Sequence, residues 1–231
     1  MIEKADYLII ESAKLDRSEV EGLINIRIKP LWLSNVDLSG ADLSRLDLCD
    51  TYFERCNLTE TDFTATKLEA TTWKGCKGAK VKFKSAMLNE GKFENSDLNN
   101  SDWQNCRLGI VSFTSCKLTG SNFSGAASLG VTFKDTLLVG TFLLGFSFLK
   151  CELDNLDFSD ADLRDVDFRN TVFKGGSLSN ARVNGARFDN ADLREASLHG
   201  LKLMDAKQFK GAIISKNQAA MLLSSLGLTV A

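Results

Sequence analysis

The sequence is almost without proline and histidine. Among 231 residues, Pro30 is the single proline and His199 the single histidine. The lack of proline excludes Pro-rich linkers. A nucleophile activated by histidine would have to be built on His199 alone. The CxxC spacing of common zinc sites is also missing, although the chain has six cysteines.

A long hydrophobic run and a strong net charge are missing as well. The most apolar run, LLVGTFLLGFSFL at residues 137–149, is shorter than the roughly 20 residues of a membrane helix. The N-terminus, MIEKADYLII, carries acidic residues where a signal peptide has a basic stretch. The net charge of −2 argues against binding to nucleic-acid phosphates. We therefore expect a soluble, cytoplasmic protein that binds neither membranes nor nucleic acid directly.

What the sequence does contain is a repeat of five residues. Stepping by five from Leu38 to Leu203 visits 34 positions, of which 32 are Leu, Phe, Trp or Val; Gly78 and Ser128 are the exceptions. We call these large residues the centres of the repeats. Two residues before each centre, 30 of 34 positions are Ala, Cys, Ser, Thr, Val or Gly. No insertion shifts this phase. One large and one small residue in every five therefore point inward.

A period of five fits neither an α-helix nor a flat strand. It fits a chain that turns a corner every five residues, so that four sides close a square coil of 20 residues. Residues 20 apart should then stack, and the column 33, 53, 73, 93, 113, 133, 153, 173, 193 reads L-F-W-F-F-F-L-F-L. Large rings sorted into columns support a four-sided coil.

Each five-residue repeat is called a word here, and clear examples are VDLSG, ADLSR, CNLTE, SNFSG, ADLRD and ADLRE. These words resemble the pentapeptide-repeat family, whose consensus is A(D/N)LXX. The resemblance covers about residues 21–210 and implies an all-β, right-handed quadrilateral β-helix. About nine coils at roughly 4.8 Å each would give a rod of roughly 45 Å. Residues 1–20 would form an N-terminal cap, in which YLII (7–10) is a strand or turn over the first coil.

Residues 211–231 predict a C-terminal helix and tail. Ser215-x-x-Gln218 is a capping-box pattern, an apolar stripe follows, and Gly227 can end the helix in the left-handed conformation. The pattern by itself predicts a helical lid on the last coil.

This tail, Q-x-x-x-L-L-x-x-L-G-L-x-V, is similar to that of Qnr-type and McbG-type members of the family. The resemblance implies a non-enzymatic homodimer that mimics DNA and is joined at its C-terminal end. The helix and tail would then be a dimer seam, either instead of a lid or in addition to it. The candidate residues of the seam are Gln218, Leu222, Leu223, Leu226, Leu228 and Val230. Such a protein would bind a type II topoisomerase, DNA gyrase or topoisomerase IV, and modulate it or protect it from poisons such as quinolones. A general protein-interaction scaffold with another partner is the alternative.

The segment 136–150 breaks the rule that outward residues are polar. The outward positions of this segment hold Leu137, Val139, Phe142, Leu144 and Leu149. Contiguous exposed apolar area usually marks an interface. The segment 137–149, with Phe142, Leu144 and Leu149 at its centre, is therefore a candidate partner-binding surface and would be the recognition surface of a scaffold.

Residues 156–170 read LDFSD-ADLRD-VDFRN and raise the question of an acidic site. Asp157, Asp162 and Asp167 each precede an inward residue, so they should lie on three successive sides and point apart. They cannot converge on one metal ion or act as a paired acid and base. Asp157, Asp162 and Asp167 are candidate partner-binding residues of a partial DNA mimic. We expect Arg182 above Asp162 and Arg187 above Asp167 to cancel part of this acidic field, and Asp157 to stay unpaired.

No feature of the sequence indicates an enzyme, a cofactor or a metal site. His199 falls on an outward position, and five of the six cysteines fill the inward small register. Cys56 and Cys76 share a column one coil apart, so a disulfide between them stays open, although a cytosolic chain should keep them reduced. The lysines of residues 74–84, around the word CKGAK, form either a solvated face or a short basic loop.

Overall fold

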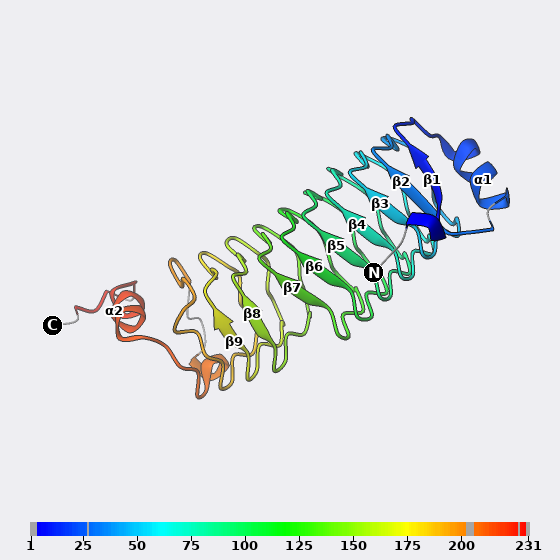
Figure 1. The fold of residues 1–231 in the computed structure, drawn as a ribbon. Coiled ribbons are helices and arrows are strands. Elements are labelled where there is room, and N and C mark those ends of the chain that lie inside the picture. Colours follow the sequence, from blue (N-terminus) through cyan, green and yellow to red (C-terminus); the bar gives the residue numbers. More distant parts are fainter. Residues whose placement is uncertain (1–3, 27, 202–205, 226, 230–231) are drawn as a thin grey trace. The chain divides into compact units, whose positions relative to one another are not determined.

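A computed structural model describes residues 4–26, 28–201, 206–225 and 227–229. The chain forms two compact units, which comprise Met1–Thr132 and Phe133–Ala231. In both units the backbone turns a corner every five residues, and residues 20 apart pair in parallel on consecutive coils (Figure 1). The expected quadrilateral β-helix is confirmed.

The first unit begins with a cap of mixed structure. Strand β1 pairs in parallel with β2, so the expected strand over the first coil is present. The five strands after β1 pair in sequence order, for example Phe53 with Trp73 and Trp73 with Phe93. The elements are η1 (Lys4–Asp6), β1 (Leu8–Glu11), α1 (Arg17–Ile26), β2 (Leu31–Ser34), β3 (Tyr52–Glu54), β4 (Thr72–Lys74), β5 (Lys92–Glu94) and β6 (Ser112–Thr114).

The second unit is built from the same type of coil and ends in helices. Strand β8 pairs in parallel with β7 and with β9. The predicted C-terminal helix is present as α2. The elements are β7 (Thr132–Lys134), which starts one residue before the unit, β8 (Glu152–Asp154), β9 (Val172–Lys174), η2 (Ala206–Phe209) and α2 (Lys216–Ser225).

Almost every corner is a tight turn with one residue in the left-handed region. At the corner after Phe158, Asp160 has φ of 58° and the N–H of Ala161 donates to the carbonyl of Phe158 at 3.1 Å. A positive φ at the third residue is a feature of type II turns, and this conformation favours Gly, Asn and Asp. Asp165 (φ 59°) closes the next word in the same way. Asp160 and Asp165 are therefore turn residues of two successive corners.

The interior of the first unit holds two columns of stacked rings. Phe53, Trp73, Phe93 and Phe113 form one column, in which the rings of Phe53 and Trp73 lie 3.8 Å apart and 5° from parallel. Phe63, Phe83, Trp103 and Phe123 form the other, and rings of the two columns meet edge to face. In the second unit a stack runs through Phe148, Phe168, Phe188 and Phe209.

The start of the coils and their number differ from the expectation. The boundary at residue 21 falls inside α1, and the first coil begins at Leu31. Strands β2 to β9 follow at intervals of 20 residues, which gives about eight turns instead of nine. The reason is local: Asp16 and Glu19 form a capping box, with Asp16 N to Glu19 Oε2 at 2.8 Å and Glu19 N to Asp16 Oδ1 at 3.0 Å, and so start a helix.

Gly78 stands at a centre position where a large residue is expected, yet the coil keeps its phase there. Its N–H donates to the carbonyl of Asp97 at 2.7 Å, the same bond that Leu58 makes to Lys77 in the coil before. A Cβ at Gly78 would lie 2.5 Å from the Val81 side chain and 3.0 Å from Leu58. The space of the missing side chain is therefore filled by its neighbours, and no basic loop opens at this word.

We expect Gly78→Ala to destabilise the chain by roughly 1–3 kcal/mol, because the core around it is already full. Gly22→Ala is the matched control: Gly22 lies in α1, and nothing lies within 4 Å of the position that a Cβ would take there. The control should stabilise the helix by up to about 1 kcal/mol. Urea denaturation followed by circular dichroism measures both. Equal effects of the two substitutions would contradict the packing around Gly78.

Candidate interaction surfaces

The three aspartates of the acidic stretch lie in three separate ladders of the second unit. Asp157 pairs with Leu137 and Ser177, Asp162 with Phe142 and Arg182, and Asp167 with Ser147 and Arg187. These carboxylates therefore occupy successive sides, as the five-residue spacing predicts. Over the described part of the chain, no group of His, Cys, Asp or Glu side chains is arranged to hold a metal ion.

Two of these aspartates are neutralised, but by other arginines than expected. Arg164 donates from Nε and Nη2 to the carboxylate of Asp162 at 2.8 Å each. Arg169 binds Asp167 in the same way at 2.8 and 2.6 Å. Both pairs span an inward residue, so their side chains leave the same side of the coil next to each other. The planar guanidinium fork matches a carboxylate at this distance.

The prediction that Arg182 and Arg187 make these ion pairs is wrong, although both lie in the expected ladders. The hydrogen bond from Arg164 is the main cause that lowers the pKa of Asp162, and Arg182 adds only a weaker field. The pattern D-x-R, read within a word, would have found these pairs. It also occurs at Asp192 and Arg194, which form a third such pair.

Asp157 differs because Ser159 stands where the other words carry arginine. Its carboxylate accepts the N–H of Ser159 at 2.9 Å and forms no ion pair with any described residue. The hydroxyl of Ser159 starts a chain of hydrogen bonds through Ser177 and Ser179 to Ser197, with steps of 2.8, 2.8 and 3.0 Å. We call this side of the second unit the serine side; it comprises Leu137, Asp157, Ser159, Asp160, Ser177, Ser179, Ser197 and His199.

The outward apolar residues of segment 137–149 are exposed, as their positions indicate. Leu137, Phe142, Leu144 and Leu149 are between 40 % and 46 % exposed. They do not form one flat patch: Leu137 lies in the ladder of Asp157, Phe142 in that of Asp162, and Leu149 follows Ser147 in that of Asp167. The residues thus form an apolar belt over three successive sides of one coil.

The tail combines features of a lid and of a free apolar surface. Ser215 N donates to Gln218 Oε1 at 2.6 Å and Gln218 N to Ser215 Oγ at 3.2 Å, which is the predicted capping box. The Gln218 amide also donates to the carbonyls of Leu193 and Ala196, so α2 is tied to the last coil. Leu222 is buried, whereas Leu223 is 39 % and Leu228 is 55 % exposed. Leu226 and Val230 lie outside the described residues.

Comparison with known sequences matches the description "Pentapeptide repeat region" to residues 31–103, 71–143 and 146–216. This chain belongs to the pentapeptide-repeat family. Two solved structures of QnrB1, a plasmid-mediated fluoroquinolone resistance protein, share its fold. A trypsin-treated variant of QnrB1 has a TM-score of 0.59 at 23 % identity, over 84 % of this chain and 97 % of that one. The full-length form has a TM-score of 0.55 at 20 % identity, over 96 % and 100 %.

No curated protein matches the sequence. A further pentapeptide-repeat structure, HetL of the cyanobacterium Nostoc, involved in heterocyst differentiation regulation, aligns with a TM-score of 0.36 at 19 % identity, over 86 % of this chain and 94 % of that one. Both α-helices in the described part of the chain are short, and neither is long and apolar enough to cross a membrane.

The cysteines of this pentapeptide-repeat protein are all free thiols. Cys56, Cys76, Cys106 and Cys116 are buried in the small register, as expected, while Cys49 and Cys151 are partly exposed. Burial raises the pKa of Cys106 to about 12 and that of Cys116 to about 11. Such thiols stay protonated at neutral pH and are poor nucleophiles.

Two lysines of residues 74–84 pair with acidic residues of the coil before. Lys80 lies 3.4 Å from Glu60 and Lys82 lies 3.4 Å from Asp62. Each pair joins residues 20 apart, so the charges alternate along the ladder. Lys80 and Lys82 thus belong to a paired, solvated face.

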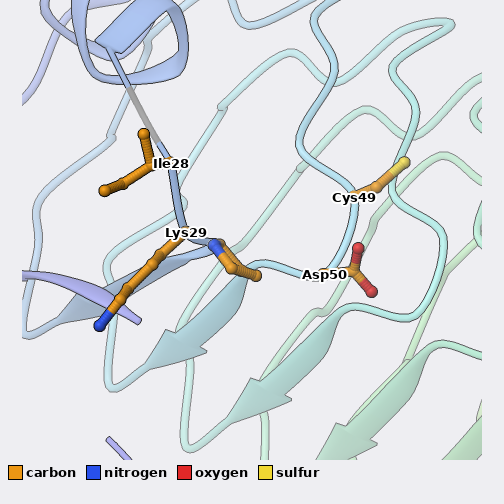
Figure 2. Close-up of a pocket in the computed structure, with 5 residues that line it drawn as sticks. Ile28, Lys29, Cys49 and Asp50 are labelled. Atoms are coloured by element: carbon orange, nitrogen blue, oxygen red, sulfur yellow. The ribbon is translucent and has the colours of Figure 1, made fainter. Parts of the chain in front are cut away.

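A shallow pocket near the first coil holds one lysine and one cysteine, and both side chains donate hydrogen bonds to other groups of the protein. It is lined by Ile28, Lys29, Pro30, Cys49 and Asp50 (Figure 2). The Lys29 ammonium donates to the carbonyl of Ala5 at 2.7 Å. The Cys49 thiol donates to Glu69 at 3.1 Å, and burial raises its pKa to about 12. Neither side chain is available as a nucleophile or base.

The Asp162–Arg164 pair predicts an acid-sensitive contribution to stability. Only 7 % of the Asp162 side chain is exposed, and its native pKa lies below its unfolded value. The pair therefore stabilises the fold above the unfolded pKa of about 3.9, and this contribution is lost as the pH falls through the native pKa. We expect Asp162→Asn to lower the free energy of unfolding at pH 7 by roughly 1–2 kcal/mol.

Urea denaturation at several pH values between about 7 and about 3, a range that spans the unfolded pKa, measures this effect. The difference between wild type and Asp162→Asn should shrink toward the acid end. Asp157→Asn is the control, because Asp157 has no ion pair with a described residue to lose, and its effect should stay within about 0.5 kcal/mol. A loss that does not depend on pH would contradict the assignment.

Proposed function

We propose that this pentapeptide-repeat protein is a non-enzymatic, cytoplasmic ligand of a type II topoisomerase, DNA gyrase or topoisomerase IV. It would modulate the enzyme or protect it from poisons such as quinolones. The observation that supports this function is the likeness to QnrB1, a fluoroquinolone resistance protein, which extends over nearly the whole of both chains. The tail resemblance noted in the sequence points the same way.

The charge arrangement favours a partial mimicry of DNA. A β-helix whose sides carry regularly spaced carboxylates can occupy a cleft that binds DNA phosphates. The pairs at Asp162, Asp167 and Asp192 remove three of these carboxylates from such a role. Contacts to the enzyme would therefore depend on carboxylates without a cationic partner among the described residues, of which Asp157 is the clearest case in the second unit.

We further propose that two copies associate through the C-terminal end. Leu222 faces its own unit, but Leu223 and Leu228 leave apolar area exposed at the tail. Gln218 holds α2 on the last coil, so these side chains are presented on a fixed helix and turn. One element can thus act as the lid of one copy and as the seam to the next.

A scaffold function is the second candidate, and the apolar belt favours it. Four large apolar side chains exposed on one coil are unusual on a surface with no partner. In this case the belt, with Phe142 and Leu144 at its centre, would bind a protein other than a topoisomerase.

A gyrase supercoiling assay with and without ciprofloxacin tests the first candidate. We expect the purified protein either to inhibit supercoiling or to restore it in the presence of the drug, because it would compete for the DNA-binding cleft. The double variant Phe142→Ser and Leu144→Ser should retain this effect if the belt serves another partner. Absence of inhibition, protection and gyrase binding would remove the topoisomerase function.

The double variant Leu223→Glu and Leu228→Glu tests the seam. Two carboxylates in an apolar contact would shift the protein from dimer to monomer, as measured by sedimentation equilibrium. Ile28→Glu is the control, since Ile28 is 96 % exposed and belongs to the first unit. A wild-type protein that is monomeric at tens of micromolar would contradict the proposed dimer.

A further inference from the structure

The serine side of the second unit carries no lysine or arginine. Between residues 133 and 201, which the structure describes throughout, the lysines and arginines all lie on the other three sides. Lys134 and Lys174 accompany the strands, Arg182 lies in the ladder of Asp162, and Arg187 in that of Asp167. The remaining cations are Lys150, Arg164, Arg169 and Arg194, and none belongs to a word of the serine side.

Two carboxylates of this side are left without neutralisation. Asp157 makes no ion pair with a described residue because the residue two positions on is Ser159, and Asp160 projects from an exposed corner. On the other sides, every aspartate that directly precedes a centre in this stretch is held by an arginine two residues later. Between residues 133 and 201, the serine side is therefore the one side whose carboxylates have no lysine or arginine on the same side.

The chemistry next to these carboxylates suits a hydrogen-bonding cationic partner. The hydroxyls of Ser159, Ser177, Ser179 and Ser197 run along the coil axis and can accept or donate further bonds. Leu137 lies directly beside Asp157 in the same ladder and is 41 % exposed. Carboxylates, hydroxyls and one apolar contact complement arginine side chains, whose guanidinium groups donate in a plane and whose stems are apolar.

We propose that the serine side is the docking surface for the arginine- and lysine-rich DNA-binding cleft of the topoisomerase. This inference rests on the proposed function and names the side that performs it. Charge complementarity selects this side, since the three other sides would bring their own cations against those of the cleft.

The aspartate–arginine pairs of the same unit suggest a substitution that tests this proposal. Ser159→Arg would recreate the arrangement of Asp162 with Arg164, so that Asp157 is neutralised by a side chain that the fold already accommodates elsewhere. Ser147→Arg is the matched control: the substitution and the change in net charge are the same, but Ser147 lies in the ladder of Asp167, on the opposite side of the coil from Asp157.

Binding of wild type and both variants to purified gyrase is measured by surface plasmon resonance at two salt concentrations. We expect Ser159→Arg to raise the Kd by at least about tenfold and to reduce its salt dependence, because attraction between opposite charges is screened by salt. Ser147→Arg should stay within about twofold of wild type. Circular dichroism melting checks that all three proteins are equally folded.

The outcomes separate the two levels of the proposal. Wild-type binding that Ser159→Arg leaves unchanged, or that both variants weaken equally, overturns the assignment of the serine side while the topoisomerase function stands. Asp157→Asn is a second variant for the same binding measurement, and it removes the charge without adding a large side chain. It should also weaken binding to gyrase. Wild-type protein that binds neither gyrase nor topoisomerase IV overturns the function and this docking surface together.

Discussion

The left-handed residue at the corners is the constraint on which the structure depends. The coil places one positive φ in almost every word, and Asn, Asp and Gly fill many of these positions. Others hold residues that adopt this conformation at a cost of roughly 1–2 kcal/mol, such as Ile110 at φ 60°. Hydrogen bonds between coils offset this cost: the N–H of Ile110 donates to the carbonyl of Leu129 at 3.0 Å. Hydrogen bonds between stacked coils thus fix the left-handed backbone conformation of the corner, even where the corner residue does not favour it.

The same corners decide which surface charges can meet. Because the centre of each word points inward, the residues before and after it leave the coil side by side, and they also face residues 20 positions away. In the first unit, lysines pair with acidic residues 20 positions away, as Lys67 does with Asp47 at 3.2 Å. In the second unit, arginines pair with the aspartate two positions earlier in the same word, as Arg164 does with Asp162. The length and planarity of the guanidinium group fit this pairing within one word.

The repeat made much of the fold predictable, and its limits explain what was missed. Phase and column follow from residue type alone, so the ring stacks, the turn role of Asp160 and the capping box at Ser215 could be predicted. Helix α1 lies before the repeat and was overlooked, although Asp16 and Glu19 carry a capping-box signal. The partner of Asp162 was missed because Arg164 and Arg182 both satisfy the spacing, and side-chain geometry chooses between them.

Net charge is a poor guide to what such a protein can bind. The value of −2 for the whole chain averages sides with opposite character. A single residue per word, arginine at 164 and serine at 159, decides whether the preceding aspartate is paired or left to the solvent. A partner that contacts one side of a β-helix meets only the charges of that side, since more distant ones are screened within roughly 10 Å. Recognition by a repeat of this kind is therefore decided word by word.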